Sequence, residues 1–362
     1  MIVVVKVGTS SITDDRGTID ASAVRELCDQ VAAARQQGHQ VVVVTSGAIA
    51  AGLPALGLAD QRPTDAVTLQ AASAVGQSHL MAVYDRALAH HDLVGGQVLL
   101  APLDFMNRQQ YLHARNTLGR LLELGVVPVV NENDAIADDE IRFGDNDRLA
   151  ALVAHLIGAD LLALLTDTPG VLTADPRLDQ EASLIEEIIE VDQQLEARAG
   201  GTGSRRGSGG MASKLAAAKI AAWSGVRVVI AAADRAEVLV DAIGGRPVGT
   251  VIHPRDRRLP SRKLWIAFAV GSAGRIVVDD GARRALLSDG RSLLAAGVTG
   301  VEGDFLAETA VEVVGPDGAV FAKGLTRVGA GDLAAYAGRR SDDLPAGLPG
   351  EVIHRDDLVV LP

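Results

Sequence analysis

The sequence predicts a mainly parallel α/β/α sandwich followed by a small, mainly β, barrel-like domain. Three observations support this fold class. Apolar runs without polar alternation, which are typical of strands buried on both faces of a sheet, alternate with longer stretches that are apolar at helical spacing. A proline-bounded, charge-rich segment then precedes short β-like pieces separated by glycine and aspartate. We therefore expect an α/β domain over 1–252, a linker over 253–263 and a β domain over 264–362.

Length and composition exclude several classes of protein. The 362 residues fit two domains, and a content of 48% hydrophobic but only 3% aromatic residues indicates an aliphatic core. A net charge of −12 disfavours a nucleic-acid or anionic-lipid partner. The single cysteine, Cys28, excludes an internal disulfide, and no apolar run reaches the ~20 residues of a membrane span. Because the start MIVVVKVG is typical of a strand rather than a signal peptide, we expect a cytoplasmic protein with no membrane partner.

The predicted elements of the first domain alternate along the chain. Strands are expected at 2–7, 41–44, 94–100, 126–130, 161–165 and 226–231. Helices are expected at 21–37, 69–90, 109–124 and 146–157. In the second domain, helices at 282–287 and 330–337 interrupt the β-like pieces. Ligands bind beyond the carboxyl ends of the strands in such sheets, so the residues that follow these strands are the first candidates for a site.

The first two predicted strands end in residues that suit an anion. Lys6 lies within an apolar run, and Gly8 and the hydroxyl residues after it offer backbone N–H and hydroxyl groups to an anion. A lysine in such a strand is costly unless its charge is matched; the alternative is an edge strand with a snorkelling lysine. After the second strand, Ser46 and Gly47 could bind a carboxylate or phosphate at a helix start, although Ser46 is equally suited to cap that helix.

Two clusters of acid and amide side chains flank one short excursion of the chain. Residues 131–134, with the sequence NEND, follow a predicted strand, and residues 144–147, with the sequence GDND, open a predicted helix. Asp145 or Asn146 could merely cap that helix, and a loop rich in aspartate is usually solvated. The paired clusters could instead bind an ammonium group, organise lysines, or hold Mg²⁺ through oxygens.

Two further segments suit a nucleotide. The strand at 161–165 ends in Thr166 and Asp167, followed by a Pro–Gly turn. A glycine-rich loop leads through 209–211 into a helix whose first turn carries Ser213 and Lys214. A helix N-terminus beside a glycine loop and a lysine is a polyphosphate site on physical grounds, although neither a Walker A nor a GxGxxG sequence is present. The alternative is a flexible surface loop.

Six motifs together resemble the amino acid kinase family. They are VKVGTS at 5–10, VVVVTSGAIAAG at 41–52, PVVNENDAI at 128–136, FGDNDRLAA at 143–151, LLTDTPGVLTADP at 164–176 and GSGGMASKLAAA at 207–218. The segment GRIVVDDGARRALLSDGRSLLAAGVTGVEGDF, at 274–305, resembles the PUA domain found appended to many members. The resemblance covers essentially the whole chain, and the NENDAI and GDND pair is specific to the members that phosphorylate glutamate.

The resemblance implies ATP-dependent phosphorylation of the side-chain carboxylate of L-glutamate, with Mg²⁺ as cofactor, in the first step of proline biosynthesis. It implies that Lys6 and Lys214 are catalytic and stabilise the transferring phosphoryl group, with Asp147 positioning them. The implied ATP-binding residues are Lys6, Gly8, Thr166, Asp167, Ser208, Gly209, Gly210, Met211, Ala212, Ser213 and Lys214. The implied glutamate-binding residues are Ser46, Gly47, Asp134, Asp145 and Asn146. No metal ligand is assigned.

The resemblance also implies partners. They are proline as a feedback inhibitor, further copies of the chain in a dimer or tetramer, and a glutamyl phosphate reductase.

Two other functions fit parts of the sequence. PUA-type domains often occur in RNA-binding proteins, but residues 264–362 carry nine basic against fourteen acidic side chains, and phosphate binding needs the opposite balance. A kinase acting on another small acid, such as N-acetylglutamate or carbamate, is the other alternative. The acid and amide clusters favour an acceptor with a free ammonium group, because an acetylated nitrogen needs no acidic partner.

Overall fold

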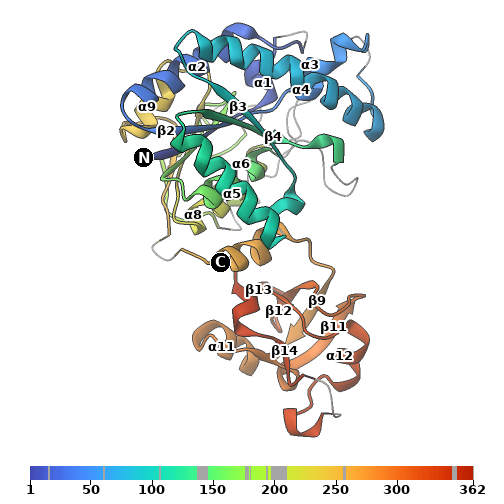
Figure 1. Ribbon diagram of the computed structural model, residues 1–362. Helices are drawn as coiled ribbons and strands as arrows, with labels where there is room; N and C mark the ends of the chain where they lie inside the picture. The colour runs from blue at the N-terminus through green and yellow to red at the C-terminus, as the bar shows by residue number, and fades with distance from the viewer. Residues whose placement is uncertain are drawn as a thin grey trace. The chain divides into compact units, whose positions relative to one another are not determined.

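A computed structural model divides the chain into two compact units, Met1–Arg258 and Leu259–Pro362. The first unit runs from blue to yellow and the second from orange to red in Figure 1. The division falls within the segment 253–263 that was predicted as a linker. The structure describes residues 1–14, 17–59, 62–105, 107–136, 146–175, 179, 181–192, 195–196, 210–255, 258–344 and 349–361.

The first unit is built on an eight-stranded sheet with the order β3-β4-β2-β1-β5-β7-β8-β6. The strands are β1 (Ile2–Val7), β2 (Gln40–Val44), β3 (Gly95–Leu100), β4 (Val127–Glu132), β5 (Leu161–Thr166), β6 (Glu187–Ile188), β7 (Arg227–Ala232) and β8 (Thr250–Ile252). The β7–β8 pair is antiparallel and the other pairs of this sheet are parallel. The continuous apolar runs of β1, β2, β4 and β5 are buried on both faces, as the sequence predicts. The prediction is wrong for β3, because this strand lies at the edge of the sheet and only its last residue is fully buried.

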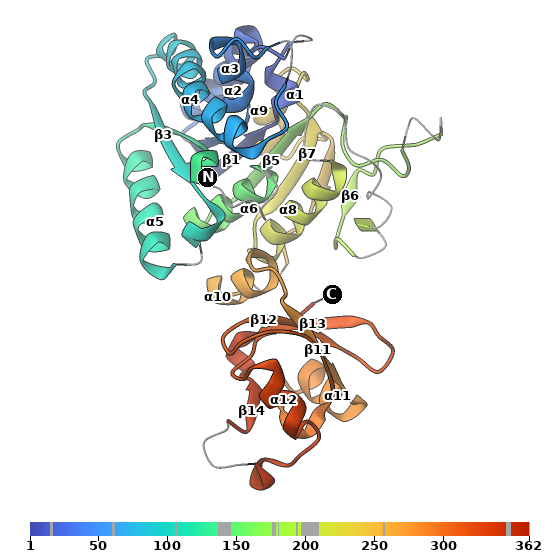
Figure 2. The same cartoon turned by 90° about the vertical axis from the view of Figure 1, so that its right-hand side faces the viewer.

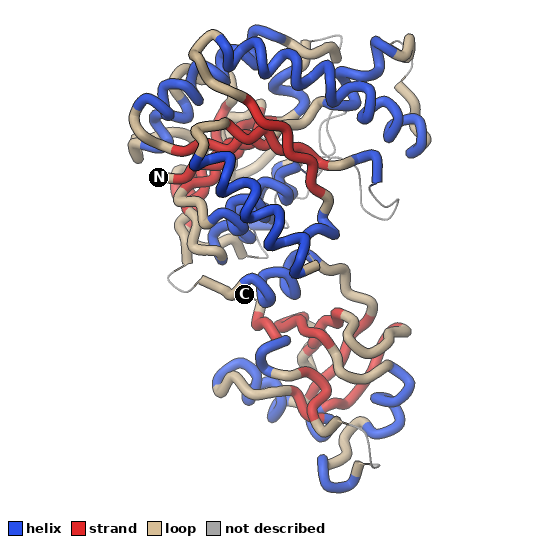
Figure 3. The backbone as a smooth tube through the Cα atoms, in the orientation of Figure 1, coloured by secondary structure: helices blue, strands red, loops and turns tan. Residues whose placement is uncertain are grey.

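Helices cover both faces of this sheet (Figures 2 and 3). One layer holds α2 (Ala21–Gln36), α3 (Ala48–Ala55), α4 (Ala66–Ala89) and α9 (Val238–Ile243), and the other holds α5 (Arg108–Glu123), α6 (Asn146–Ile157) and α8 (Met211–Trp223). Short turns of helix follow three strands: α1 (Thr9–Ile12), η1 (Pro102–Phe105) and η2 (Asp134–Ile136). Asp20, Asp65 and Asn107 cap α2, α4 and α5 by accepting hydrogen bonds from backbone N–H groups, each worth about 1 kcal/mol.

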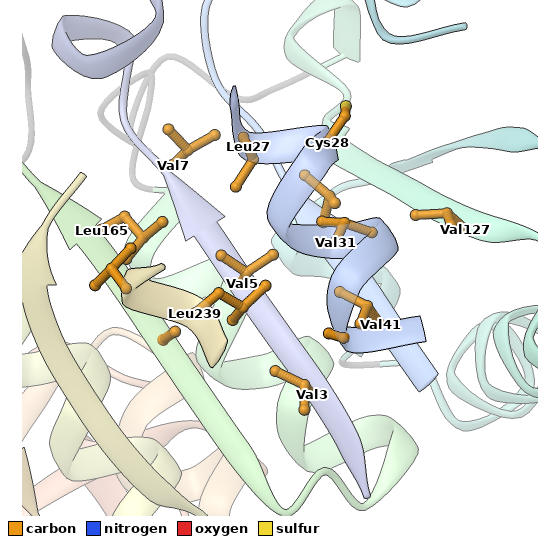
Figure 4. Packing of buried hydrophobic residues seen from close by; sticks show 14 of the residues in the cluster. Val3, Val5, Val7, Leu27, Cys28, Val31, Val41, Val127, Leu165 and Leu239 are labelled. Carbon is orange, nitrogen blue, oxygen red and sulfur yellow. The ribbon is translucent and has the colours of Figure 1, made fainter. Parts of the chain in front are cut away.

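The central strand β1 shows how the sheet separates its core from its site. Val3, Val5 and Val7 are buried in one cluster with residues of α2 and α9 (Figure 4). Each such side chain stabilises the fold by roughly 1.5–3 kcal/mol through burial. Since successive side chains of a strand point to opposite faces, Val4 and Lys6 face the layer of α6 and α8. Because β1 pairs with β2 on one side and β5 on the other, the alternative of Lys6 snorkelling from an edge strand is wrong.

The second unit is mainly β. Its five-stranded sheet has the order β11-β9-β12-β13-β15, and a two-stranded pair joins β10 and β14. The strands are β9 (Gly274–Val278), β10 (Leu293–Leu294), β11 (Val298–Gly303), β12 (Ala310–Val314), β13 (Val320–Leu325), β14 (Glu351–Ile353) and β15 (Leu358–Val360). The two predicted helices are present as α11 (Asp280–Ser288) and α12 (Ala330–Tyr336). A short helix α10 (Ser261–Leu264) begins in the segment predicted as a linker and ends at the first residue of the predicted β domain.

The six strands predicted for the first unit are all present, shifted by at most two residues at their ends. The sequence predicts only the start of helix α3, after Ser46 and Gly47, and not its extent, because Gly52 and Pro54 within it are typical turn residues. The short strands β6 and β8 also escape prediction. Within the described part of the chain, no helix combines the length and the apolar character needed to cross a membrane.

Candidate active site

The three predicted catalytic residues meet at the carboxyl end of β1. Lys6 Nζ lies 2.6 Å from Asp147 Oδ1, and Lys214 Nζ lies 3.2 Å from Asp147 Oδ2. Lys6 lies near the end of the central strand β1, Asp147 lies in the first turn of α6, and Lys214 lies in the first turn of α8. Segments far apart in the sequence thus place one carboxylate between two ammonium groups.

The charged groups of this cluster are buried, so water and salt screen them little. Asp147 is 1% exposed, and the two lysines are also buried. Burial alone would raise the pKa of Asp147, but the charges of Lys6 and Lys214 outweigh it and hold that pKa below its ordinary value. Two buried ammonium groups thus share one carboxylate, an arrangement that suits an anion.

Backbone and hydroxyl groups around the lysines suit an anion as well. A Cβ atom built on Gly8 would lie 3.6 Å from Lys6 Nζ, so the ammonium group sits directly beside this part of the backbone. Gly210 is the N-cap of α8 and supplies no side-chain cap, which leaves the first N–H groups of the helix available. Ser213 Oγ lies 3.0 Å from Asp147 Oδ2 and 2.9 Å from the carbonyl oxygen of Gly210.

A chain of buried amides lies next to this cluster. Asn146 Nδ2 donates to Ser46 Oγ at 2.9 Å and to Asn131 Oδ1 at 3.2 Å. Asn131 Nδ2 in turn donates to Gln77 Oε1 at 3.4 Å, which connects the end of β4 to helix α4. Asn146 Oδ1 is buried and has no hydrogen-bond partner among the described residues, so a polar ligand group is the natural partner for it.

Ser46 and Gly47 form the turn between β2 and α3. Gly47 adopts φ +94°, and a Cβ there would lie 3.1 Å from side-chain atoms of Ile12 and Ile19. Only glycine fits this left-handed turn without strain. The N-cap of α3 is Gly47 and no side chain caps the helix, so the alternative role of Ser46 as a helix cap is wrong. Its hydroxyl instead accepts from Asn146.

Asp134 is another buried carboxylate of the region. Its Oδ2 accepts a hydrogen bond from Ser73 Oγ at 2.6 Å, and the residue is 7% exposed. Burial raises the pKa of Asp134, and the hydrogen bond from Ser73 opposes this change. Unlike Asp147, it has no ion pair with any cation in the described part of the chain. A carboxylate of this kind suits a cationic ligand group.

The remaining predicted site residues are distributed as follows. Thr166 is buried at the end of β5, and its hydroxyl donates to Asp167 Oδ1 at 3.1 Å. Asp145, Ser208 and Gly209 lie outside the residues that the structure describes. Among the described residues, no group of three or more His, Cys, Asp or Glu side chains could hold a metal ion.

Three residues next to the predicted site were not predicted as site residues: Ser73 and Asn131 contact predicted residues, and Gln77 contacts Asn131. Asn131 carried a signal, because it lies in the NEND cluster, whereas Ser73 and Gln77 carried none, because they lie inside a long helix. Their part in the site follows from tertiary packing alone.

Comparisons with known proteins decide which family this arrangement belongs to. Residues 1–232 match the amino acid kinase family, and residues 274–348 match the PUA domain. Glutamate 5-kinase from Pelobacter propionicus is 46% identical over 99% of this chain and 97% of its own length. Those from Mycobacterium ulcerans and Burkholderia ambifaria are 46% and 45% identical over 99% of this chain and 96% and 97% of their own lengths. The chain belongs to the amino acid kinase family, in its glutamate 5-kinase branch.

A solved structure agrees on the fold. Carbamate kinase from Giardia lamblia bound to AMP-PNP superposes with a TM-score of 0.51 at 18% identity, covering 70% of this chain and 98% of that chain. The predicted fold class is thereby confirmed: an amino acid kinase fold, built on a mostly parallel sheet with helices, is followed by a PUA domain made of strands.

Proposed function

We propose that this amino acid kinase transfers the γ-phosphoryl group of ATP to the side-chain carboxylate of L-glutamate. A carboxylate oxygen attacks the γ-phosphorus, the bond from that phosphorus to the bridging oxygen of ADP breaks, and ADP and L-glutamyl 5-phosphate leave. The observation that carries the proposal is the buried cluster of Lys6, Asp147 and Lys214. Full-length relatives that carry the name glutamate 5-kinase support the acceptor and the place of the reaction at the start of proline biosynthesis.

The chemistry needs charge and position rather than a general base. A glutamate side chain has an ordinary pKa of about 4.3, so the nucleophile is already ionised at neutral pH. No histidine lies within the site motifs. The barrier comes from bringing one anion to another and from the charge that spreads over the transferring phosphoryl oxygens. Two fixed ammonium groups stabilise that charge without reorganising during the reaction.

The proposed roles divide between the two lysines and the carboxylate that holds them. Lys6 and Lys214 contact the phosphoryl group in transit and are the catalytic residues. Asp147 holds the two ammonium groups on its two carboxylate oxygens, Lys6 on Oδ1 and Lys214 on Oδ2. The hydroxyl group of Ser213 lies within hydrogen-bond distance of the same oxygen as Lys214. Without Asp147, two buried positive charges would repel each other and separate.

The ATP site is proposed along the carboxyl ends of β1 and β5 and the start of α8. Phosphate groups bind to the free N–H groups at the start of α8, because the helix dipole and these donors both favour an anion. The proposed ATP-binding residues are Lys6, Gly8, Thr166, Asp167, Ser208, Gly209, Gly210, Met211, Ala212, Ser213 and Lys214.

The glutamate site is proposed beside this centre. Asp134 binds the ammonium group of glutamate, while Ser46 and Asn146 orient the amino acid through polar contacts. Gly47 and Asp145 complete the proposed site. Because Asn146 precedes Asp147 in the same helical turn, the acceptor and the lysine cluster share one rigid element.

Mg²⁺ is proposed to accompany ATP. Both oxygens of Asp147 already contact ammonium groups, so this carboxylate is not suited to ligate the ion. Mg²⁺ usually takes phosphate oxygens, waters and one or two carboxylates, a set that needs no cage of protein side chains. The ion would neutralise charge on the phosphates, and ATP itself would hold most of it.

ADP release tests the proposal. The full chain is incubated with ATP, Mg²⁺ and L-glutamate, L-aspartate or N-acetyl-L-glutamate, and an acyl phosphate product is trapped with hydroxylamine. We expect ADP and hydroxamate in equal amounts with glutamate and neither with the other two acids. Activity with N-acetylglutamate and none with glutamate would contradict the proposal. The RNA-binding alternative is not favoured, because the relatives align along the full chain as kinases.

The partners stay predictions of the same kind. We propose that the protein acts in the cytoplasm, forms a dimer or tetramer, and hands its acyl phosphate to a glutamyl phosphate reductase. Proline shares a carboxylate and a nitrogen with glutamate and is proposed to inhibit by occupying the glutamate site. Inhibition by proline that excess glutamate fails to relieve would contradict this overlap.

A further inference from the structure

One turn of helix α4 touches both walls of the proposed glutamate site. Its buried residues Ser73, Gly76 and Gln77 face three different neighbours. Ser73 donates to Asp134, Gly76 packs on helix α3, and Gln77 Nε2 donates to the carbonyl oxygen of Glu132 at 3.4 Å. The turn thus connects the helix that follows Ser46 with the segment that carries Asp134.

The contact between α3 and α4 is made by backbone. A Cβ atom on Gly76 would lie 1.7 Å from the carbonyl oxygen of Ala48, and one on Gly52 would lie 1.9 Å from that of Ala72. No side chain fits between the two helices at this crossing. Interfaces in which backbones touch have little freedom to slide, so the crossing fixes how far α3 lies from Ser73.

The hydrogen bond from Ser73 to Asp134 has the length of a charge-assisted bond. Its 2.6 Å separation falls in the range for a hydroxyl donating to an ionised carboxylate. A serine inside a helix commonly donates to a backbone carbonyl of the preceding turn, as Ser78 does to Val75 at 3.0 Å. The hydroxyl group of Ser73 instead donates its hydrogen bond to Asp134. Asp134 Oδ1 makes no hydrogen bond to any described residue.

We propose that Ser73 is a positioning residue for the acceptor: its hydroxyl holds one oxygen of Asp134 so that the other meets the ammonium group of the amino acid. The α3–α4 crossing keeps this carboxylate at a set distance from Ser46, so the pair recognises an amino acid with a free ammonium group. This inference rests on the proposed function, because it assigns a second role within the same acceptor site.

Steady-state kinetics of the full chain test the inference. Ser73→Ala removes the donor, Ser73→Cys keeps nearly the same volume with a weak donor, and Ser78→Ala is the matched control on the same helix. A hydrogen bond to a charged group is worth enough for Ser73→Ala to raise the KM for glutamate about 10-fold. We expect an intermediate rise for Ser73→Cys, no change for Ser78→Ala, and an unchanged KM for ATP in all three.

A double-mutant cycle separates positioning from a general packing effect. If Ser73 acts through Asp134, Ser73→Ala changes kcat/KM for glutamate by no more than about 2-fold in an Asp134→Asn background. An unchanged glutamate KM in both Ser73 variants, or equal losses in the two backgrounds, overturns the inference. Thermal unfolding verifies that each variant is folded, and Ser73→Cys carries the test alone if Ser73→Ala is not. A wild-type chain inactive with glutamate would instead contradict the proposed function itself.

Discussion

The phosphoryl-transfer centre and the acceptor side of the site bury carboxylates in opposite ways. Asp147 lies between two lysines, and their charges lower its pKa despite complete burial. Asp134 has a serine hydroxyl and no cation among the described residues, and burial raises its pKa. The first carboxylate is satisfied before any ligand binds, whereas the second still lacks the positive charge that would match it.

This difference suits the two carboxylates to different functions, Asp147 to catalysis and Asp134 to substrate binding. A centre that must stabilise a transition state benefits from charges that are already in place, because nothing has to reorganise during the reaction. A binding site gains selectivity when the ligand supplies the missing charge, because a ligand without it leaves a buried group unpaired. Asp147→Asn and Asp134→Asn should therefore have opposite effects on the stability of the free protein.

The largest expected effect is that of Asp147→Asn on stability. Removing one partner of a buried ion pair typically costs about 3–5 kcal/mol, here because two ammonium groups would remain side by side. Urea unfolding of the ligand-free chain measures the free energy of unfolding. Asp134→Asn is the matched variant, and at neutral pH it should stabilise the free protein, because it removes a buried charge that lacks a cation. Equal signs for the two variants would contradict the comparison.

Turnover comes next. Lys6→Ala or Lys214→Ala should lower kcat by about 100-fold to 1,000-fold, the range for losing one preorganised electrostatic donor. Lys219→Ala, on the same helix as Lys214 but paired with Glu196 at 3.0 Å, is the control and should keep kcat. Coupled assay of ADP release gives these values. Near-normal turnover in either site variant would remove that lysine from the mechanism.

Glutamate affinity should respond to Asp134. Asp134→Asn leaves the volume and the bond from Ser73 but removes the charge that meets the ammonium group, so the KM for glutamate should rise by about 10-fold to 100-fold. The KM for ATP should stay unchanged. An unaltered glutamate saturation curve would show that the ammonium group binds elsewhere.

The helix crossing gives a smaller effect. Gly76→Ala forces a methyl group against the backbone of α3 and should destabilise the protein by about 1–3 kcal/mol. Gly119, in helix α5, has open space where a Cβ would be, so Gly119→Ala should stabilise the protein by about 0.5–1 kcal/mol. Urea unfolding of both variants measures the contrast, and a loss of stability in Gly119→Ala alone would contradict this view of the packing.

The pH dependence is the finest test. The pKa of Asp134 is raised in the folded protein, so ionisation of this carboxyl lowers the stability of the protein as pH rises through that pKa. Protonation of the same carboxyl weakens glutamate binding as pH falls through that pKa. The KM for glutamate should therefore rise on acidification, and this rise should be absent in Asp134→Asn. For Asp147 the sign is reversed: its lowered pKa gives stability that is lost only as pH falls through the folded value.

The sequence predicts the phosphoryl-transfer centre better than the acceptor side. Three charged residues lie at the end of a strand or the start of a helix, where a charged side chain departs from the local sequence pattern: Lys6, Asp147 and Lys214. Ser73 and Gln77 are ordinary residues of a long helix, and only the crossing with α3 turns them toward the site. For helix α3 only the start was predicted, because the glycine and proline within it are typical turn residues.

Kinetics of Lys214→Ala and Asp134→Asn, measured side by side with glutamate as the varied substrate, test the division of labour most directly. We expect Lys214→Ala to lower kcat about 100-fold or more with little change in glutamate KM, and Asp134→Asn to raise glutamate KM about 10-fold or more with kcat largely kept. The same pattern of kcat and KM in both variants would contradict a site in which one carboxylate organises catalysis and the other recognises the acceptor.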